Sequence, residues 1–311
     1  MPITLPAQAG EAVTHRGITL VPLFPRRNPA ADYVTLQPAL RRGLVVAERG
    51  AEGSVPELVV TNPLGQAVLL YDGEELLGAK QNRILNVTVL VAAKSETQFP
   101  VSCVEQGRWT ARGTSFQAAR HAAYPELRRR KAEQLSAEPL VRGLAQGAVW
   151  DEVAAKAGRH GVASPTSAAA DIYARREADL ANLREAFPLA AGQSGAVLGL
   201  GDMQLCLDYV SRPAAFAQLY PKLLDGYLLD ALERLDGRPA SAERIRRFVT
   251  SVEAAPTRRS PSAGVGDDVR LARNGVVGSG LVLREELLQA SAFTTDRNGP
   301  RTRVARPSRR R

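Results

Sequence analysis

Short apolar runs dominate the first third of this chain, and no helix-like pattern lies between them. Runs of this length, separated by Pro, Gly or Asn, are typical of strands in an antiparallel sandwich or barrel. The first third is therefore predicted to be β-rich. Eight such runs occur: 18–24, 33–36, 44–49, 57–62, 66–71, 75–79, 84–91 and 97–105.

After residue 112 the hydrophobic period lengthens to that of a helix. The middle predicts helices, and the last third predicts strands and helices in alternation. The order β, then α, then β with α indicates the α+β class. We expect an antiparallel β-sandwich or barrel-like sheet from the N-terminal third and the C-terminal strands, with a helical segment in the middle. The predicted helices are 114–136, 149–158, 164–187, 221–235 and 241–253, and the late strands are 195–200, 203–210 and two or three within 269–293.

Both ends of the chain are rich in predicted strands, so we expect late strands to complete an early sheet within a single domain. The alternative is two domains that divide near residue 112. The single-domain organisation has an N-terminal arm, one α+β domain and a disordered tail. Its parts are residues 1–14 (arm), 15–112 (β-rich), 113–190 (helical), 191–295 (β with α) and 296–311 (tail).

The net charge of +9 suggests nucleic-acid binding, but its distribution weakens that interpretation. Residues 297–311 hold seven arginines and no acid, which leaves +2 on residues 1–296. The tail has no hydrophobic period and little to bury, so it is predicted to be disordered. A solubilising tail is the first interpretation, and weak, salt-sensitive contact with nucleic acid or acidic partners is the alternative.

Cysteine and histidine usage excludes several classes of site. Cys103 and Cys206 lie far apart within predicted strands, which indicates small buried side chains in a reducing compartment. The three histidines are scattered and predict no metal site. The N-terminus lacks a signal-peptide pattern, and no apolar run approaches the ~18 residues of a membrane span. We expect a cytoplasmic protein without membrane contact.

The densest polar stretch of the chain is YDGEELLGAKQNRILN, residues 71–86. If the predicted strands 84–91 and 97–105 form a hairpin, Arg83 and Glu105 lie near the same end of the sheet. Further polar and aromatic side chains would collect at that end. These are Lys80, Asn82, Arg108 and Trp109.

Cations, an amide, an acid and a large aromatic side chain together suit an anionic ligand with a flat ring. A nucleotide fits this set, with Arg and Lys on phosphate, Trp109 on the base and Glu105 on the ribose hydroxyls. The competing interpretation is structural. In that case arginine and glutamate side chains connect the loops, and Trp109 fills a core position.

The continuation of this stretch, DGEELLGAKQNRILNVTVLVAAKSETQFPVSCVEQGRW, resembles a bacterial family named for its association with ADP-ribosylglycohydrolases and the rhodanese–phosphatase superfamily. Three later segments are similar too: ARHAAYPELRRR, VWDEVAAKAGRHGVASPTSAAADIY and LDYVSRPAAFAQLYPKLLDGYLLDAL. The resemblance spans roughly residues 15–293 and favours one domain. It implies an association with ADP-ribose or NAD-derived chemistry and assigns no catalytic residue and no cofactor.

Two functions follow as expectations from the polar cluster and the resemblance. In the first, the protein binds or processes an ADP-ribose- or NAD-derived nucleotide, with an ADP-ribosylglycohydrolase-type protein as partner. Glu74 or Glu105 would then act as general acid or base. The ligand-binding residues would be Lys80, Asn82, Arg83, Arg108 and Trp109. In the second, the protein is a non-enzymatic accessory or scaffold protein, and the polar cluster is structural.

Overall fold

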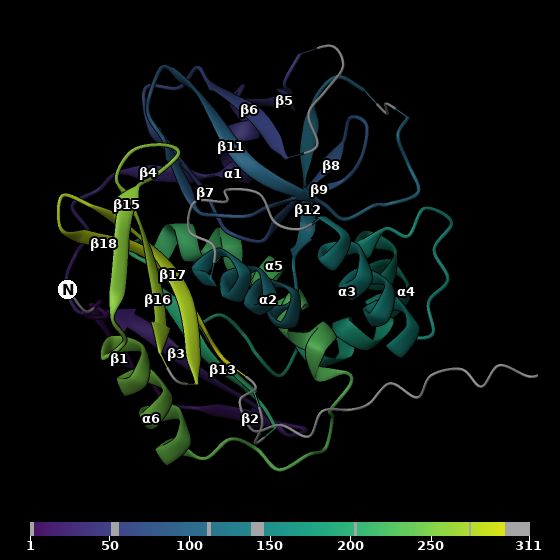
Figure 1. The fold of residues 1–311 in the computed structure, drawn as a ribbon. Helices are drawn as coiled ribbons and strands as arrows, with labels where there is room; N and C mark the ends of the chain where they lie inside the picture. The colour runs from purple at the N-terminus through teal and green to yellow at the C-terminus, as the bar shows by residue number, and fades with distance from the viewer. Residues whose placement is uncertain are drawn as a thin grey trace, which may run out of the picture.

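The computed structural model describes residues 3–50, 56–110, 113–137, 146–201, 204–273 and 275–295. The predicted disordered tail, 296–311, lies outside these residues. The fold is α+β, as predicted, with mostly antiparallel sheets. In Figure 1 a β-rich lobe forms the top of the view, a curled sheet lies at the lower left, and helices fill the space between and beside them.

A nine-stranded antiparallel sheet joins the two ends of the chain. Its order is β1-β3-β13-β14-β18-β17-β16-β15, and β2 also pairs with β3. Val21 on β3 lies opposite Val197 on β13, so an early strand pairs directly with a late one. Residues assigned to the N-terminal arm contribute β1. The strands are β1 (Ala7–Ala9), β2 (Val13–His15), β3 (Ile18–Pro25), β13 (Gly195–Leu200), β14 (Gln204–Val210), β15 (Thr257–Pro261), β16 (Asp267–Arg273), β17 (Val276–Leu283) and β18 (Glu286–Thr294).

The upper lobe contains a six-stranded sheet in the order β12-β8-β9-β11-β6-β5. A bridge between Ala47 and Ser115 brings its two edges together, so the sheet is barrel-like. A three-stranded sheet, β10-β7-β4, includes the parallel pair β4 and β7. The strands are β4 (Tyr33–Thr35), β5 (Val45–Glu48), β6 (Glu57–Asn62), β7 (Ala67–Leu70), β8 (Glu74–Gly78), β9 (Arg83–Leu85), β10 (Val89–Val91), β11 (Ser95–Cys103) and β12 (Phe116–Ala122).

The helices pack between and against these sheets (Figure 1). Helix α5 is central and buries most of its length, while α6 starts at the N-cap Ser241, whose hydroxyl accepts a hydrogen bond from the Arg244 amide. Within the described residues, no helix is long and apolar enough to cross a membrane. The helices are α1 (Leu36–Arg41), α2 (Pro125–Ala137), α3 (Gln146–Arg159), α4 (Ala169–Arg184), α5 (Pro213–Ala231) and α6 (Ala242–Glu253).

Three helices start five or more residues away from their predicted positions. Helix α4 begins at Ala169 and not at residue 164, because the Ser164 hydroxyl accepts from the Ala168 amide in a turn before the helix. The other two errors also have local causes. The predicted helix 114–136 is wrong before Pro125, because residues 116–122 form β12 against β8 and the helix begins at the proline. Helix α5 begins at Pro213, eight residues before Pro221, which lies inside the helix.

The predicted strand 84–91 is also wrong as a single element. It divides into β9 and β10, which belong to different sheets. The residues between them are held by side-chain hydrogen bonds. Asn86 accepts one from the Ser102 hydroxyl, and Thr88 accepts one from the Asp72 amide. These bonds replace the strand ladder where the chain leaves one sheet for the other.

A layer of buried ion pairs connects the upper lobe to the nine-stranded sheet and the helices. Its centre is Asp208 on β14, which accepts two hydrogen bonds from Arg128 and one each from the hydroxyls of Tyr71 and Tyr227. Burial alone raises the pKa of Asp208, but the charge and hydrogen bonds of Arg128 outweigh it, and the pKa is lowered. The carboxylate is therefore ionised inside the protein.

The sequence Asp72-Gly73-Glu74-Glu75 supplies the other acids of this layer. Asp72 accepts from Lys131 at 2.6 Å, Glu74 from Lys222 at 2.7 Å, and Glu75 lies 2.7 Å from His121. All three acids are at most 4% exposed. Part of the stretch that we expected to face a ligand is therefore inside the protein, where it holds α2, α5 and β12 against β8.

Candidate functional site

The pairing of β9 with β11 brings the predicted site residues together at one end of the six-stranded sheet. Arg83 lies opposite Cys103, and Glu105 follows two residues later. The loop after β8 supplies Lys80, Gln81 and Asn82. Arg83 and Glu105 thus lie near the same end of the sheet, as the hairpin argument predicted.

Groups of the surrounding loops donate hydrogen bonds to both carboxylate oxygens of Glu105. Its two carboxylate oxygens accept from Arg108 Nε and Nη2 at 2.9 and 2.7 Å, and also from the Asn82 amide and the Thr166 hydroxyl. Burial acts to raise the pKa of Glu105, but these hydrogen bonds and the Arg108 charge lower it overall. The side chain is 2% exposed, so Glu105 joins the loops to each other.

Arg108 completes the same frame. Its Nη1 donates to the carbonyl oxygens of Ala79 and Thr110, at 2.7 and 2.8 Å. Its Nη2 also lies 3.2 Å from the side-chain oxygen of Asn82. The guanidinium thus closes the loop after β8 onto the loop after β11, which is the structural role that the competing interpretation described.

Arg83 differs, because its hydrogen bonding is incomplete. The side chain is fully buried, and Nη1 donates to Gln81 at 2.8 Å. Among the described residues, Nε and Nη2 have no hydrogen-bond partner of good geometry, although the guanidinium interacts with the Cys103 sulfur. Nη2 also lies 3.8 Å from Glu48, whose carboxylate oxygens lack hydrogen-bond partners within the same residues. Burial lowers the pKa of Arg83. Unsatisfied buried groups of this kind are few in native proteins, so the incomplete hydrogen bonding of Arg83 calls for an explanation.

Trp109 covers this cluster and faces solvent. It is 49% exposed, and Arg83 Cζ and Lys80 Nζ lie 5.8 and 5.4 Å from its ring centroid. Both distances lie in the range of cation–π contact. Trp109 is therefore not the core plug of the structural interpretation. We call Trp109, Lys80 and Arg83 the Trp109 face.

The remaining predicted residue, Glu74, belongs elsewhere. It lies in the buried layer, bound to Lys222 and to the Tyr71 amide, and within the described residues it shares no hydrogen-bond partner with Glu105. Cys103 lies closer to the Trp109 face, but burial raises the pKa of its thiol, so the thiolate is disfavoured. From the sequence we expected Glu74 at the candidate site, but the fold places it in the buried layer of ion pairs.

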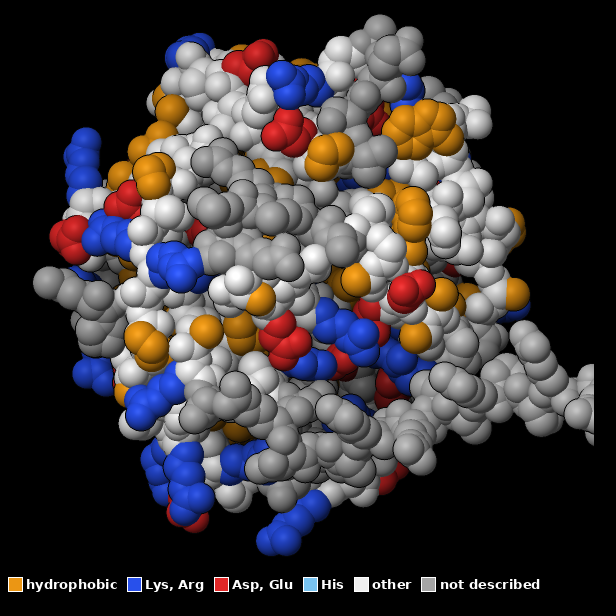
Figure 2. All heavy atoms as spheres, viewed as in Figure 1, with side chains coloured by type: hydrophobic (Ala, Val, Ile, Leu, Met, Phe, Trp, Pro, Cys, Tyr) orange, Lys and Arg blue, Asp and Glu red, His pale blue; other side chains and the backbone are white. Residues whose placement is uncertain are grey.

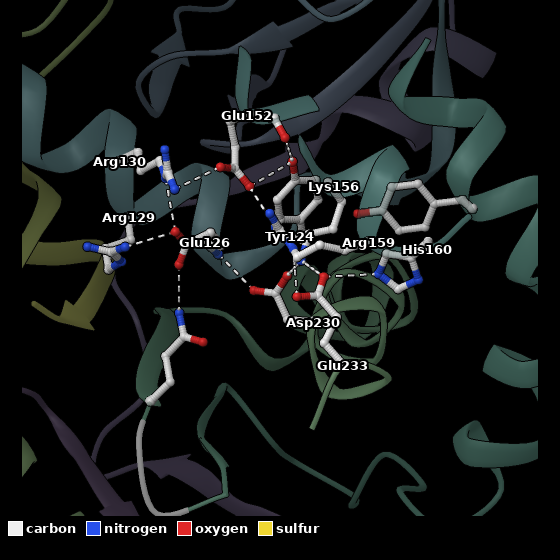
Figure 3. A network of polar contacts seen from close by, with 12 residues as sticks. Tyr124, Glu126, Arg129, Arg130, Glu152, Lys156, Arg159, His160, Asp230 and Glu233 are labelled. Carbon is white, nitrogen blue, oxygen red and sulfur yellow. Dashed lines mark hydrogen bonds and ion pairs between the residues drawn. The ribbon is translucent and has the colours of Figure 1, made fainter. Parts of the chain in front are cut away.

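A second polar network lies where α2, α3 and α5 meet, and its residues were not predicted (Figure 3). Lys156 on α3 is its centre. This buried ammonium contacts Asp230 at 2.6 Å and Glu233, and it lies 4.5 Å from the Tyr124 ring centroid. Arg130 and Arg159 reach the buried Glu152 at 2.9 and 3.1 Å. In Figure 2, charged side chains gather in a hollow just below the centre of the view, where Figure 1 shows these helices.

We call this second polar network the helix network. The pKa values of its acids are shifted in opposite directions. Burial raises the pKa of Glu152 and of Asp230. Glu233 is less buried, and hydrogen bonds and charges from His160, Lys156 and Arg159 outweigh its burial and lower its pKa to about 2. Five carboxylates face four permanent cations, so the network is close to neutral. The cations are Arg129, Arg130, Lys156 and Arg159, and the acids are Glu126, Glu133, Glu152, Asp230 and Glu233.

The signal for this network was present in the sequence. Most of its residues come from the three later segments that carry the family resemblance, and Glu133 and Glu233 lie just after two of these segments. Their charged residues recur on one helix face, but a single sequence does not show that three such faces meet.

Comparison with known families agrees with this pattern. Residues 6–293 match the model of the ARG and Rhodanese-Phosphatase-superfamily-associated Protein domain, ARPP-1. The chain belongs to the ARPP-1 family. No curated protein and no solved structure matches it. The ARPP-1 match covers the six-stranded sheet, the helix network and the nine-stranded sheet together, so all three belong to the family domain.

Proposed function

We propose that this ARPP-1 protein binds a nucleotide of the ADP-ribose or NAD-derived class on the Trp109 face. The observation that carries the proposal is the half-exposed indole of Trp109, which lies against two cations. An exposed indole offers a stacking surface for a base, worth ~1–3 kcal/mol in stacked nucleic-acid complexes. The association with ARG proteins in the family's name is consistent with this class of ligand.

Each residue of the Trp109 face has a separate role in this proposal. The base stacks on Trp109, and the Lys80 ammonium attracts the phosphates. Arg83 is fully buried, so it contributes its positive field from beneath the ring and fixes the indole by cation–π contact. Asn82, Glu105 and Arg108 position the two loops and do not contact the ligand directly.

The proposed role is binding without catalysis. Glu105 already accepts four hydrogen bonds, and Glu74 is ion-paired in the interior. Neither carboxylate is available to exchange a proton with a ligand on the Trp109 face. We infer an accessory role, in which the protein holds the nucleotide for an ADP-ribosylglycohydrolase-type partner.

A scaffold role without any ligand is the second candidate, and one observation favours it. The closed hydrogen-bonding of Glu105 and Arg108 is what a purely structural cluster requires. Under this role Trp109 would be a contact residue for a partner protein, since tryptophan is enriched at the centres of interfaces.

Isothermal titration calorimetry separates the two candidates. Binding to ADP-ribose should be measured for the wild type, for Trp109→Ala and for Leu189→Ala, which removes an exposed apolar side chain elsewhere. AMP should bind better than ribose 5-phosphate, because only AMP carries a base. Trp109→Ala should weaken binding about tenfold or more, and Leu189→Ala should not. If ADP-ribose, NAD and AMP all give no heat of binding, nucleotide binding is excluded and the scaffold role is supported.

A further inference from the structure

Two adjoining cavities open between the N-terminal residues and the last strands of the nine-stranded sheet. Their volumes are about 350 and 510 Å³, and they share Pro6, Arg27, Glu285 and Leu287 in their walls. Figure 1 shows the N-terminus beside β15 and β18, at the edge of the view away from the six-stranded sheet and α3. Their size is that of small-molecule sites, which commonly occupy the mouths of curled sheets.

Arginine and glutamate side chains both line this groove, and their charges do not cancel. Both oxygens of Glu286 accept from the backbone amides of Ala30 and Ala31. Glu285 is paired with Arg259 at 3.0 Å. Arg27 and Arg284 line the same cavity and make no ion pair or hydrogen bond with the part of the chain that the structure describes. Arg27, Arg259 and Arg284 face Glu285 and Glu286 in the walls of the two cavities, so the groove carries a net charge of +1.

The Tyr209 hydroxyl adds a directional donor to the smaller cavity. Tyr209 is 2% exposed and lines this cavity, and within the described residues its hydroxyl makes no hydrogen bond. Burial raises the pKa of Tyr209, so the hydroxyl keeps its proton and can donate it.

The larger cavity has an apolar wall. Ile3 and Val269 lie on it together with Val282 and Leu287, and it continues directly from the smaller cavity. A ligand with an anionic headgroup and an apolar body would therefore contact arginine side chains in one cavity and apolar side chains in the adjoining one. Thr257 and Arg259 from β15 form the outer rim.

We propose that this groove binds a small anionic ligand, with a carboxylate or phosphate between Arg27, Arg284 and the Tyr209 hydroxyl, and with an apolar or aromatic body along Leu287 and Val282. The site is separate from the Trp109 face and shares no residue with it. Its geometry assigns the headgroup to the 350 Å³ cavity and the body to the 510 Å³ cavity.

The test uses 8-anilinonaphthalene-1-sulfonate as the probe, because it joins an anion to a flat apolar body. Fluorescence titration should show saturable binding to the intact protein. The double variant Arg27→Gln/Arg284→Gln should weaken binding about tenfold or more, since charge-assisted contacts are the strong ones. Arg175→Gln, an exposed arginine on α4, is the matched control and should leave the dissociation constant unchanged.

Two further variants exclude a general loss of structure. Glu285→Gln releases Arg259 and should tighten binding, whereas Tyr209→Phe should weaken it several-fold. Competition with phenyl phosphate and with benzoate identifies the preferred headgroup, and displacement by either supports the site. An unchanged dissociation constant in the folded double variant would overturn the proposal. Equally tight binding of the neutral probe N-phenyl-1-naphthylamine would also overturn it, since the arginines would then contribute nothing to the affinity.

Discussion

Arg128 donates hydrogen bonds to both carboxylate oxygens of Asp208, at 2.8 and 2.6 Å, and neither side chain is exposed to solvent. Helix α2 is thereby fixed to β14, in the middle of the nine-stranded sheet. The same guanidinium also lies 3.7 Å from Asp72 of the upper lobe. One buried ion pair therefore connects the upper lobe, the helices and the large sheet.

Arg128→Ala should lower the free energy of unfolding by ~3–5 kcal/mol, because it leaves the Asp208 carboxylate buried without its counter-charge. The double variant Arg128→Ala/Asp208→Asn should recover part of the loss, since the unpaired charge is removed. Urea unfolding measures both, with the exposed Arg175→Ala as control at within ~0.5 kcal/mol of wild type. A single variant as stable as the control would contradict the role of this pair.

Gly73 should not tolerate a side chain. Its φ of +83° is left-handed, and a Cβ there would lie 2.8 Å from Cδ of Arg128. We expect Gly73→Ala to destabilise the protein by ~1–3 kcal/mol through strain and overpacking. Gly65→Ala is the matched control, because a Cβ at Gly65 meets nothing within 4 Å. Thermal unfolding compares the two variants, and equal melting temperatures would show that α2 can move away.

Glu233 should make the helix network sensitive to acid. Its pKa falls from 4.5 to about 2 in the folded protein, so its contribution to stability is fully present above pH ~4.5 and is lost as the pH falls towards 2. Glu233→Gln should therefore be less stable than wild type at pH 7, and the difference should shrink below pH ~4.5. Urea unfolding at several pH values measures this, and a difference independent of pH would contradict the assignment.

Elements defined by local rules could be predicted from the sequence. The strands β13 and β14 follow from short apolar runs, and the start of α6 depends on the capping residue Ser241 next to it in the chain. The meeting of Arg83 and Glu105 followed from the pairing of β9 with β11. These contacts need only short-range information.

The buried charges could not be predicted in the same way. Asp72 and Glu74 pair with Lys131 and Lys222, which are 59 and 148 residues away in the chain. A charged run usually indicates a solvated surface, because burying an ion is costly unless a partner is present. The partners become evident only when α2 and α5 are placed against β8. The helix network was missed for the same reason.

The most direct measurement of nucleotide binding at the Trp109 face uses a protein with one tryptophan. The chain has two tryptophans, and Trp150→Phe replaces a partly buried indole by another aromatic ring, so the variant should fold normally. Trp109 is then the sole indole reporter. Titration with ADP-ribose should give a saturable change in its fluorescence as the base stacks on the ring. A folded variant whose Trp109 emission stays constant up to millimolar ADP-ribose, NAD and AMP would contradict nucleotide binding at this face.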